Sequence, residues 1–95
     1  MEATNKLIAE FMNLPKQIFK PSGIMNYGIK DNWYELHELS YHLSWDWLMP
    51  VVRECFENGA EGNEIGDITH GLLDFNIEAT YDAVVVFIKS LKNRY

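Results

Sequence analysis

Hydrophobic residues recur at helical spacing in three stretches, which predict amphipathic helices over about residues 3–13, 45–58 and 77–92. The first stripe comprises Ala3, Leu7, Ile8, Phe11 and Met12. The second comprises Leu48, Val51, Val52, Cys55 and Phe56. The third comprises Ile77, Tyr81, Val84, Val85, Ile88 and Leu91. Asn76 is the expected N-cap of the third helix, and Gly59 suits the end of the second.

Pro50 bears on where the second helix begins, because proline has no backbone N–H. If Ser44 is the N-cap, Pro50 falls about six residues into the helix and should loosen its first turn. If the helix begins near Trp47, this conflict disappears.

The remaining segments are less regular. Residues 14–31 contain Pro15, Pro21, Gly23 and Gly28, which suit either a surface loop or a hairpin. Residues 32–43 fit a helical and a strand period, and we expect an extended segment near 36–42. Residues 59–66 read as a loop, and 67–75 as a strand weakened by Gly71. The predicted fold is α+β, with three helices packed on a small sheet or on extended segments.

Length and composition indicate one folded domain over residues 1–95, because 47% of the residues are hydrophobic and 14% are aromatic. The single cysteine cannot form an internal disulfide. The first residues lack the basic-then-apolar order of a signal peptide. The longest apolar run, residues 83–88, is far shorter than the ~20 residues that span a bilayer. We therefore expect a cytoplasmic protein that does not associate with membranes.

The charge is distributed unevenly. Residues 31–82 contain twelve acidic residues and one arginine, whereas residues 1–30 carry a net charge of +2 and residues 83–95 of +3. An acidic middle segment repels phosphate, so we expect no nucleic-acid partner. The segment is either a solvated acidic face or a surface that docks on a basic partner.

Residue types that carry chemistry occur without a recognisable motif. His37 and His42 are five residues apart, which suits neither one helical face nor one strand face. The chain contains no Cys-x-x-Cys, His-Glu-x-x-His or glycine-rich phosphate loop. Cys55 lies on an apolar stripe beside Glu54, a setting that does not activate a thiol. We therefore expect no enzyme, and no catalytic, cofactor-binding or metal-binding residue.

The unusual stretch surrounds two tryptophans on the second predicted helix. Trp45 and Trp47 point about 200° apart on a helix, so both rings cannot face the same core. One of them must cover a neighbouring segment or remain partly exposed, and exposed tryptophan often marks a contact surface. The candidate interaction surface consists of Trp45, Trp47, Asp46, Tyr41 and Trp33.

Three blocks carry a resemblance to other proteins: residues 5–12, 41–52 and 81–89. The central block reads Tyr-His-Leu-Ser-Trp-Asp-Trp-Leu-Met-Pro-Val-Val. Together they resemble small uncharacterised phage and prophage proteins of Bacteroidetes-type bacteria, and the layout is loosely similar to the phage ABA sandwich family. This resemblance implies helices on a small sheet, but residues 58–76 are too few for several strands. It transfers no functional residue.

These observations lead to two functional expectations. The first is a non-enzymatic, phage-like accessory protein that binds another protein, in one form to modulate a host or defence function. The alternative is a protein that binds a small ligand, such as a nucleotide, as a homo-oligomer, because aromatic rings stack on bases. Both a foreign protein partner and self-association remain open, as does the oligomeric state.

Overall fold

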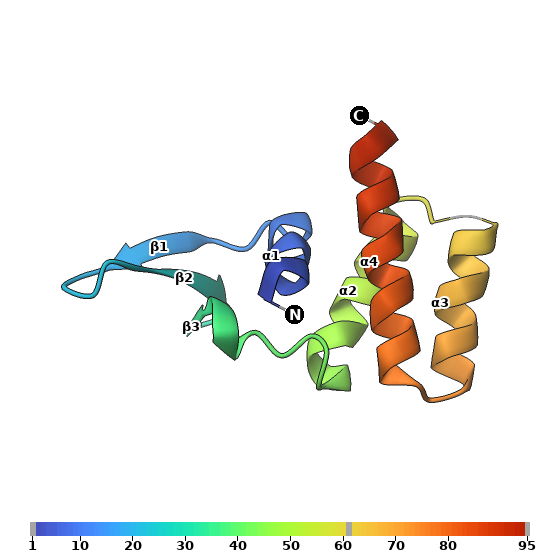
Figure 1. The fold of residues 1–95 in the computed structure, drawn as a ribbon, viewed down its shortest axis with the longest axis horizontal. Coiled ribbons are helices and arrows are strands. Elements are labelled where there is room, and N and C mark those ends of the chain that lie inside the picture. Colours follow the sequence, from blue (N-terminus) through green and yellow to red (C-terminus); the bar gives the residue numbers. More distant parts are fainter. Residues whose placement is uncertain (1, 61, 95) are drawn as a thin grey trace.

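A computed structural model describes residues 2–60 and 62–94, which fold into helices and a small antiparallel sheet (Figure 1). The elements are α1 (Glu2–Phe11), β1 (Lys16–Phe19), β2 (Ile24–Ile29), β3 (Asn32–Glu35), the 3-10 turn η1 (Leu36–Glu38), α2 (Trp45–Glu57), α3 (Asn63–Leu73) and α4 (Ile77–Arg94). The α+β class is confirmed, and α1, α2 and α4 are the three predicted helices. The prediction of three helices is too low, because the described residues form a fourth, α3.

The sheet consists of two consecutive hairpins in the order β1-β2-β3. Of the two interpretations left open for residues 14–31, the structure has the hairpin, with Ile18 opposite Met25. The second hairpin turns through two residues, Lys30 and Asp31, between the paired Ile29 and Asn32. Lys30 has a positive φ of 56°, as such short turns require.

The predicted extended segment at 36–42 is wrong. The strand ends at Glu35, and the chain then enters η1, where the Glu38 carboxylate accepts a hydrogen bond from the Glu35 N–H at 2.8 Å. A turn of three residues per repeat brings Leu36 and Leu39 to the same side, and Leu39 is buried. The apolar residues of this segment therefore follow the three-residue spacing of a 3-10 turn. The strand prediction had assumed that they alternate every second residue.

The predicted strand at 67–75 is also wrong, and the predicted loop at 59–66 is too long, because α3 begins at Asn63. Ile65, Ile68 and Leu72 recur at helical spacing, and Ile68 is fully buried. Gly71 permits close packing of α3 on α4, since a Cβ there would lie 2.5 Å from Thr80 Oγ1. The glycine that weakens a strand therefore serves a contact between helices.

The ends of the helices largely follow the sequence signals. Asn76 caps α4, because its Oδ1 accepts a hydrogen bond from the Ala79 N–H at 3.0 Å. Gly59 follows α2 with φ +88°, and the Ala60 N–H donates to the Cys55 carbonyl, as in a Schellman motif. Helix α2 starts directly after Ser44, so Pro50 lies inside the helix, on its exposed side.

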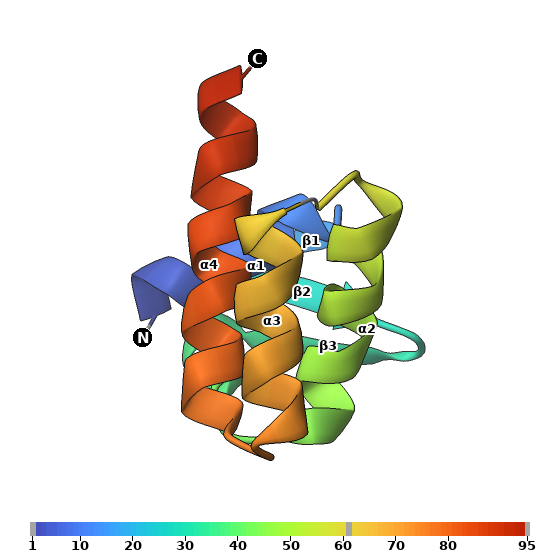
Figure 2. The same cartoon turned by 90° about the vertical axis from the view of Figure 1, so that its right-hand side faces the viewer.

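The core lies between α1, α2 and α4 and extends to α3 and one face of the sheet. Its largest fully buried side chains include Ile8, Leu48, Ile68, Tyr81 and Phe87, which come from all four helices. The molecule measures 46 × 31 × 21 Å. Helix α3 lies at the end farthest from the sheet, and the β1–β2 hairpin projects from the opposite end (Figures 1 and 2).

A buried polar cluster connects α1 with α4. The side-chain amide of Asn5 donates to the Leu39 carbonyl at 3.0 Å and lies 3.1 Å from His42 Nδ1. The Tyr81 hydroxyl donates to Asn5 Oδ1 at 2.9 Å and also contacts Thr4. Because these groups are removed from water, their mutual hydrogen bonds are needed for a stable fold.

Candidate interaction surface

The two tryptophans of α2 diverge, and Trp47 joins the helix to the sheet. Its ring contacts Tyr34 of β3 at a centroid distance of 5.0 Å and Tyr41 at 5.4 Å, both edge to face. Trp47 is half-buried by these contacts. It therefore packs against the 14–43 segment rather than standing free on the surface.

Tyr41 lies in the core, with only 3% of its surface exposed. Burial raises the pKa of its hydroxyl to about 12, so the side chain stays neutral at physiological pH. A partner could reach little of this residue, and we remove it from the candidate surface.

Trp33 is 40% exposed but lies on a different part of the molecule. The strand register places it on the face of the sheet opposite Tyr34, where its ring contacts Phe19 at 5.5 Å. It also covers Gly28, whose absent Cβ would approach the Trp33 ring to 3.1 Å. The five predicted residues therefore do not form one patch.

Trp45 borders an apolar surface that the sequence did not reveal. Trp45, Met49, Leu72 and Phe75 line a shallow depression of about 260 Å³ between α2 and the end of α3. The same helical stripes continue to Phe56 on α2 and Ile65 on α3, which are both exposed. We call these six residues the α2–α3 surface: Trp45, Met49, Phe56, Ile65, Leu72 and Phe75.

This surface exists because α2 and α3 both pack on α4. Their inner sides are covered by α4, while apolar residues on their outward sides remain in contact with solvent. Exposed apolar groups in a contiguous patch are typical of sites that bind another molecule. The sequence did not identify five of these residues as site residues. Met49 and Phe56 lie on the predicted second helix, Ile65 fell in the predicted loop, and Leu72 and Phe75 fell in the predicted strand.

Phe75 is the most exposed residue of the surface, at 87%, and its backbone is strained. It follows α3 with φ +53°, a left-handed conformation that bulky side chains rarely adopt and that glycine normally occupies here. Its N–H donates to the Leu72 carbonyl at 3.1 Å, and the Asn76 N–H donates to the Gly71 carbonyl at 3.0 Å. The fold thus holds a phenylalanine in solvent at a position where glycine would be easier to accommodate.

A second cavity, of about 360 Å³, lies between the end of α1, the β2–β3 turn and the start of α2. Tyr34 and Trp47 form an aromatic wall, and Asp46, Lys30 and Asn32 provide polar groups. This cleft contains three of the predicted residues, Tyr41, Asp46 and Trp47. It could accept a flat, polar ligand that stacks on the rings.

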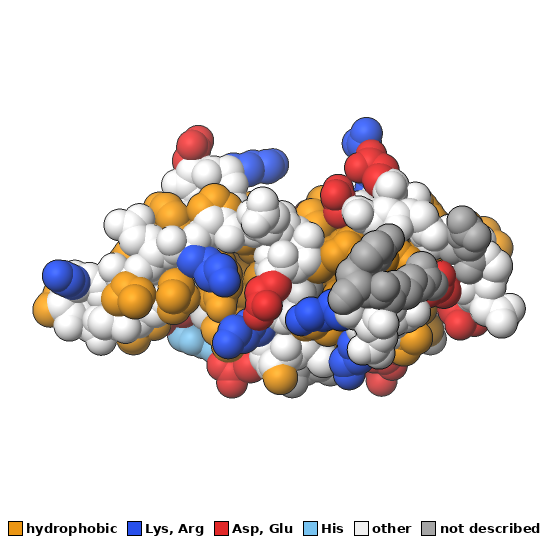
Figure 3. All heavy atoms as spheres, turned by 90° about the horizontal axis from the view of Figure 1, so that it is seen from above, with side chains coloured by type: hydrophobic (Ala, Val, Ile, Leu, Met, Phe, Trp, Pro, Cys, Tyr) orange, Lys and Arg blue, Asp and Glu red, His pale blue; other side chains and the backbone are white. Residues whose placement is uncertain are grey.

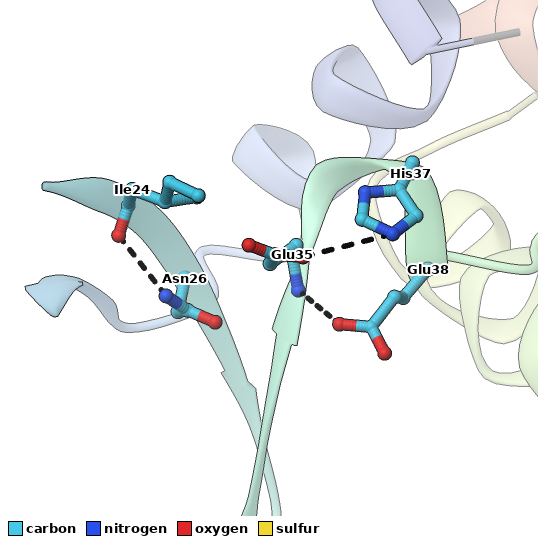
Figure 4. A network of polar contacts seen from close by, with 5 residues as sticks. All are labelled: Ile24, Asn26, Glu35, His37 and Glu38. Carbon is cyan, nitrogen blue, oxygen red and sulfur yellow. Dashed lines mark hydrogen bonds and ion pairs between the residues drawn. The ribbon is translucent and has the colours of Figure 1, made fainter. Parts of the chain in front are cut away.

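Outside these cavities, three titratable side chains lie close together at the end of β3 and in η1. Glu35, His37 and Glu38 offer three ligand atoms within 4.8 Å of one another (Figure 4). His37 Nε2 lies 3.6 Å from the Glu35 carboxylate, and Glu38 closes η1 by its hydrogen bond to the Glu35 N–H. His42, five residues from His37, is not part of this cluster and contacts Asn5.

Cys55 is fully buried on the inner side of α2. Burial, together with the negative charges of Glu54 and Glu64, raises the pKa of its thiol to about 12. A neutral, inaccessible thiol cannot serve as a nucleophile.

The α2–α3 surface lies within the most acidic part of the chain. Residues 45–78 contain eight acidic residues and one arginine, a net charge of −7. Arg53 forms an ion pair with Glu57 at 3.4 Å, and the acidic residues still outnumber it, so the segment keeps its negative net charge. A basic partner would be attracted to this part of the molecule.

Comparison of the chain with known protein families, with curated proteins and with solved structures finds no significant match. Within the residues described, no helix is long and apolar enough to cross a membrane.

Proposed function

We propose that the protein is a small non-enzymatic binding protein that contacts another protein through the α2–α3 surface. The observation that carries this proposal is Phe75, which combines 87% exposure with a strained backbone. Strain of this kind lowers stability, and it is often retained where a side chain is needed for function. The neighbouring Trp45 and Met49 extend the apolar contact beyond a single ring.

The resemblance to phage and prophage proteins suggests the form of this activity. We propose an accessory protein that modulates a host or defence function in the cytoplasm by occupying a surface of its target. The inaccessible thiol of Cys55 supports a non-enzymatic role.

The proposal is tested by comparing affinity capture for variants with one exposed side chain changed. Phe75→Ser and Met49→Ser should each reduce recovery of the partner from host lysate by ~10-fold or more, as loss of a central contact does. Val86→Ser is the matched control, because Val86 is 62% exposed on α4 and lies outside the surface. Equal recovery with all three variants would refute the assignment of this surface.

A second candidate function rests on the cleft beside Trp47. A nucleotide could stack on Trp47 and Tyr34, with Lys30 near its phosphate, in a homo-oligomer that completes the site. A thermal-shift series with nucleotides tests this idea, since a ligand at 100 times its dissociation constant stabilises by ~2.7 kcal/mol. No shift at millimolar nucleotide would remove this candidate.

A further inference from the structure

The β1–β2 hairpin ends in apolar side chains on both of its faces. Ile18 and Met25 are paired on one face, and Phe19 and Ile24 are paired on the other. Ile18, Ile24 and Met25 are all exposed, with Ile18 at 56%. The helices cover the sheet farther back, where Tyr27 is buried, so the end of the hairpin has no covering layer in the monomer (Figure 1).

The free edge of this hairpin adds to its binding capacity. Among the described residues, strand β1 pairs only with β2, so the outer edge of β1 presents backbone groups that no described strand pairs with. A two-stranded projection with apolar side chains gains stability when another surface covers it.

The hairpin and the α2–α3 surface carry opposite charges. Residues 16–29, which form the β1–β2 hairpin, contain Lys16 and Lys20 and no acidic residue, a net charge of +2, against −7 for residues 45–78. Apolar side chains lie among basic ones at the hairpin end in Figure 3. The two regions lie toward opposite ends of the 46 Å axis, so one molecule cannot bring its own hairpin to its own α2–α3 surface.

We infer that the hairpin of one molecule docks on the α2–α3 surface of a second copy, in a head-to-tail contact. This inference rests on the proposed function, because it uses the same surface and names a partner for it. The apolar residues of the hairpin, with Ile18 at the centre, cover Phe75 and Met49, while the flanking lysines face the acidic surroundings. A contact between two different patches leaves one of each free, so further copies add until a ring closes or a chain grows.

The experiment uses light scattering on a sizing column over a concentration series up to about 1 mM, which covers weak interfaces. The wild type should increase in mass with concentration, and less so at high salt. Ile18→Glu and Phe75→Glu should each weaken association by ~10-fold or more, because each places a carboxylate in apolar contact. Val86→Glu, on the outward side of α4, should associate like the wild type.

Mixing the two defective variants gives the sharper result. Ile18→Glu retains an intact α2–α3 surface, and Phe75→Glu retains an intact hairpin, so together they can form one contact and no more. The mixture should reach twice the monomer mass, while each variant alone stays monomeric. Circular dichroism of each variant must match the wild type, and a productive mixture shows that the remaining surface is folded.

Three outcomes would overturn the inference: a wild type that is monomeric throughout, a mixture that stays monomeric while the wild type associates, or association that only one of the two variants disrupts. If self-association fails but Phe75→Ser still abolishes capture of a foreign protein, the proposed function stands and only the second copy is excluded. If self-association holds and no foreign protein depends on Phe75, the foreign-partner role is excluded.

Discussion

Substitution of Phe75 by glycine and by alanine separates the backbone strain at this position from the contacts of the ring. Both variants remove the phenyl group, so they differ only in whether a Cβ must adopt the left-handed conformation at φ +53°. That conformation costs an L-residue ~1–2 kcal/mol, which glycine avoids. Relative to alanine, glycine lowers the free energy of unfolding by ~0.4–1 kcal/mol, because it gives the unfolded chain more conformational freedom. The glycine variant should therefore be more stable than the alanine variant by roughly 0.5–1 kcal/mol.

The opposite order is expected at an ordinary helical position, which provides the control. At Val86, inside α4, alanine should be more stable than glycine by ~1 kcal/mol, because glycine is a poor helix former. Urea unfolding followed by circular dichroism measures the difference in the free energy of unfolding within each pair. In thermal unfolding, a difference of 1 kcal/mol shifts the melting temperature by ~4–8 °C at this chain length. If alanine equals or exceeds glycine at position 75, the argument from backbone strain is refuted.

Three further results are expected. Gly71→Ala should destabilise by ~1–3 kcal/mol in urea unfolding, because its Cβ would overlap Thr80, whereas Gly66→Ala, with no atom within 4 Å, should be neutral or stabilising. Asn5→Ala should cost ~1–3 kcal/mol by the same assay, since its buried partners lose their hydrogen bonds; a cost below 0.5 kcal/mol, about the error of the assay, would contradict this role. Stability should fall as pH rises from about 9 to about 12, because burial raises the pKa of Cys55 to about 12 and the unfolded chain loses its proton first. Unfolding across this pH range checks the effect, and the decline should be less steep in Cys55→Ala.

The parts of the fold that could be predicted from the sequence are those fixed by local signals. Helices α1, α2 and α4 have clear apolar stripes, and Asn76 and Gly59 mark boundaries through hydrogen bonds to nearby backbone. Helix α3 was missed because residues 59–66 were assigned to a loop and residues 67–75 to a strand, and because Gly71 is a poor helix former. Glycine is needed at position 71 because Thr80 approaches it closely, and this tertiary contact cannot be predicted from the neighbouring sequence.

The candidate site was predictable only in part, for the same reason. The divergence of Trp45 and Trp47 follows from helical geometry, and the structure places them on different surfaces. Which ring would be covered depended on Tyr34 and Tyr41, whose positions follow from the sheet and the turn after it. Phe75 could be recognised as a site residue only from the structure, because it shows that α3 ends just before this residue.

Site-specific photo-crosslinking in host lysate shows directly whether the α2–α3 surface is a binding surface. A photoreactive side chain replaces Met49 in one sample and Val86 in another, because both positions are exposed and lie on different faces. If this surface binds another molecule, position 49 should give a discrete crosslinked product, whether with a foreign protein or a second copy, and position 86 should give none. Crosslinking from position 86 alone, or no product from position 49, would contradict a binding role for this surface.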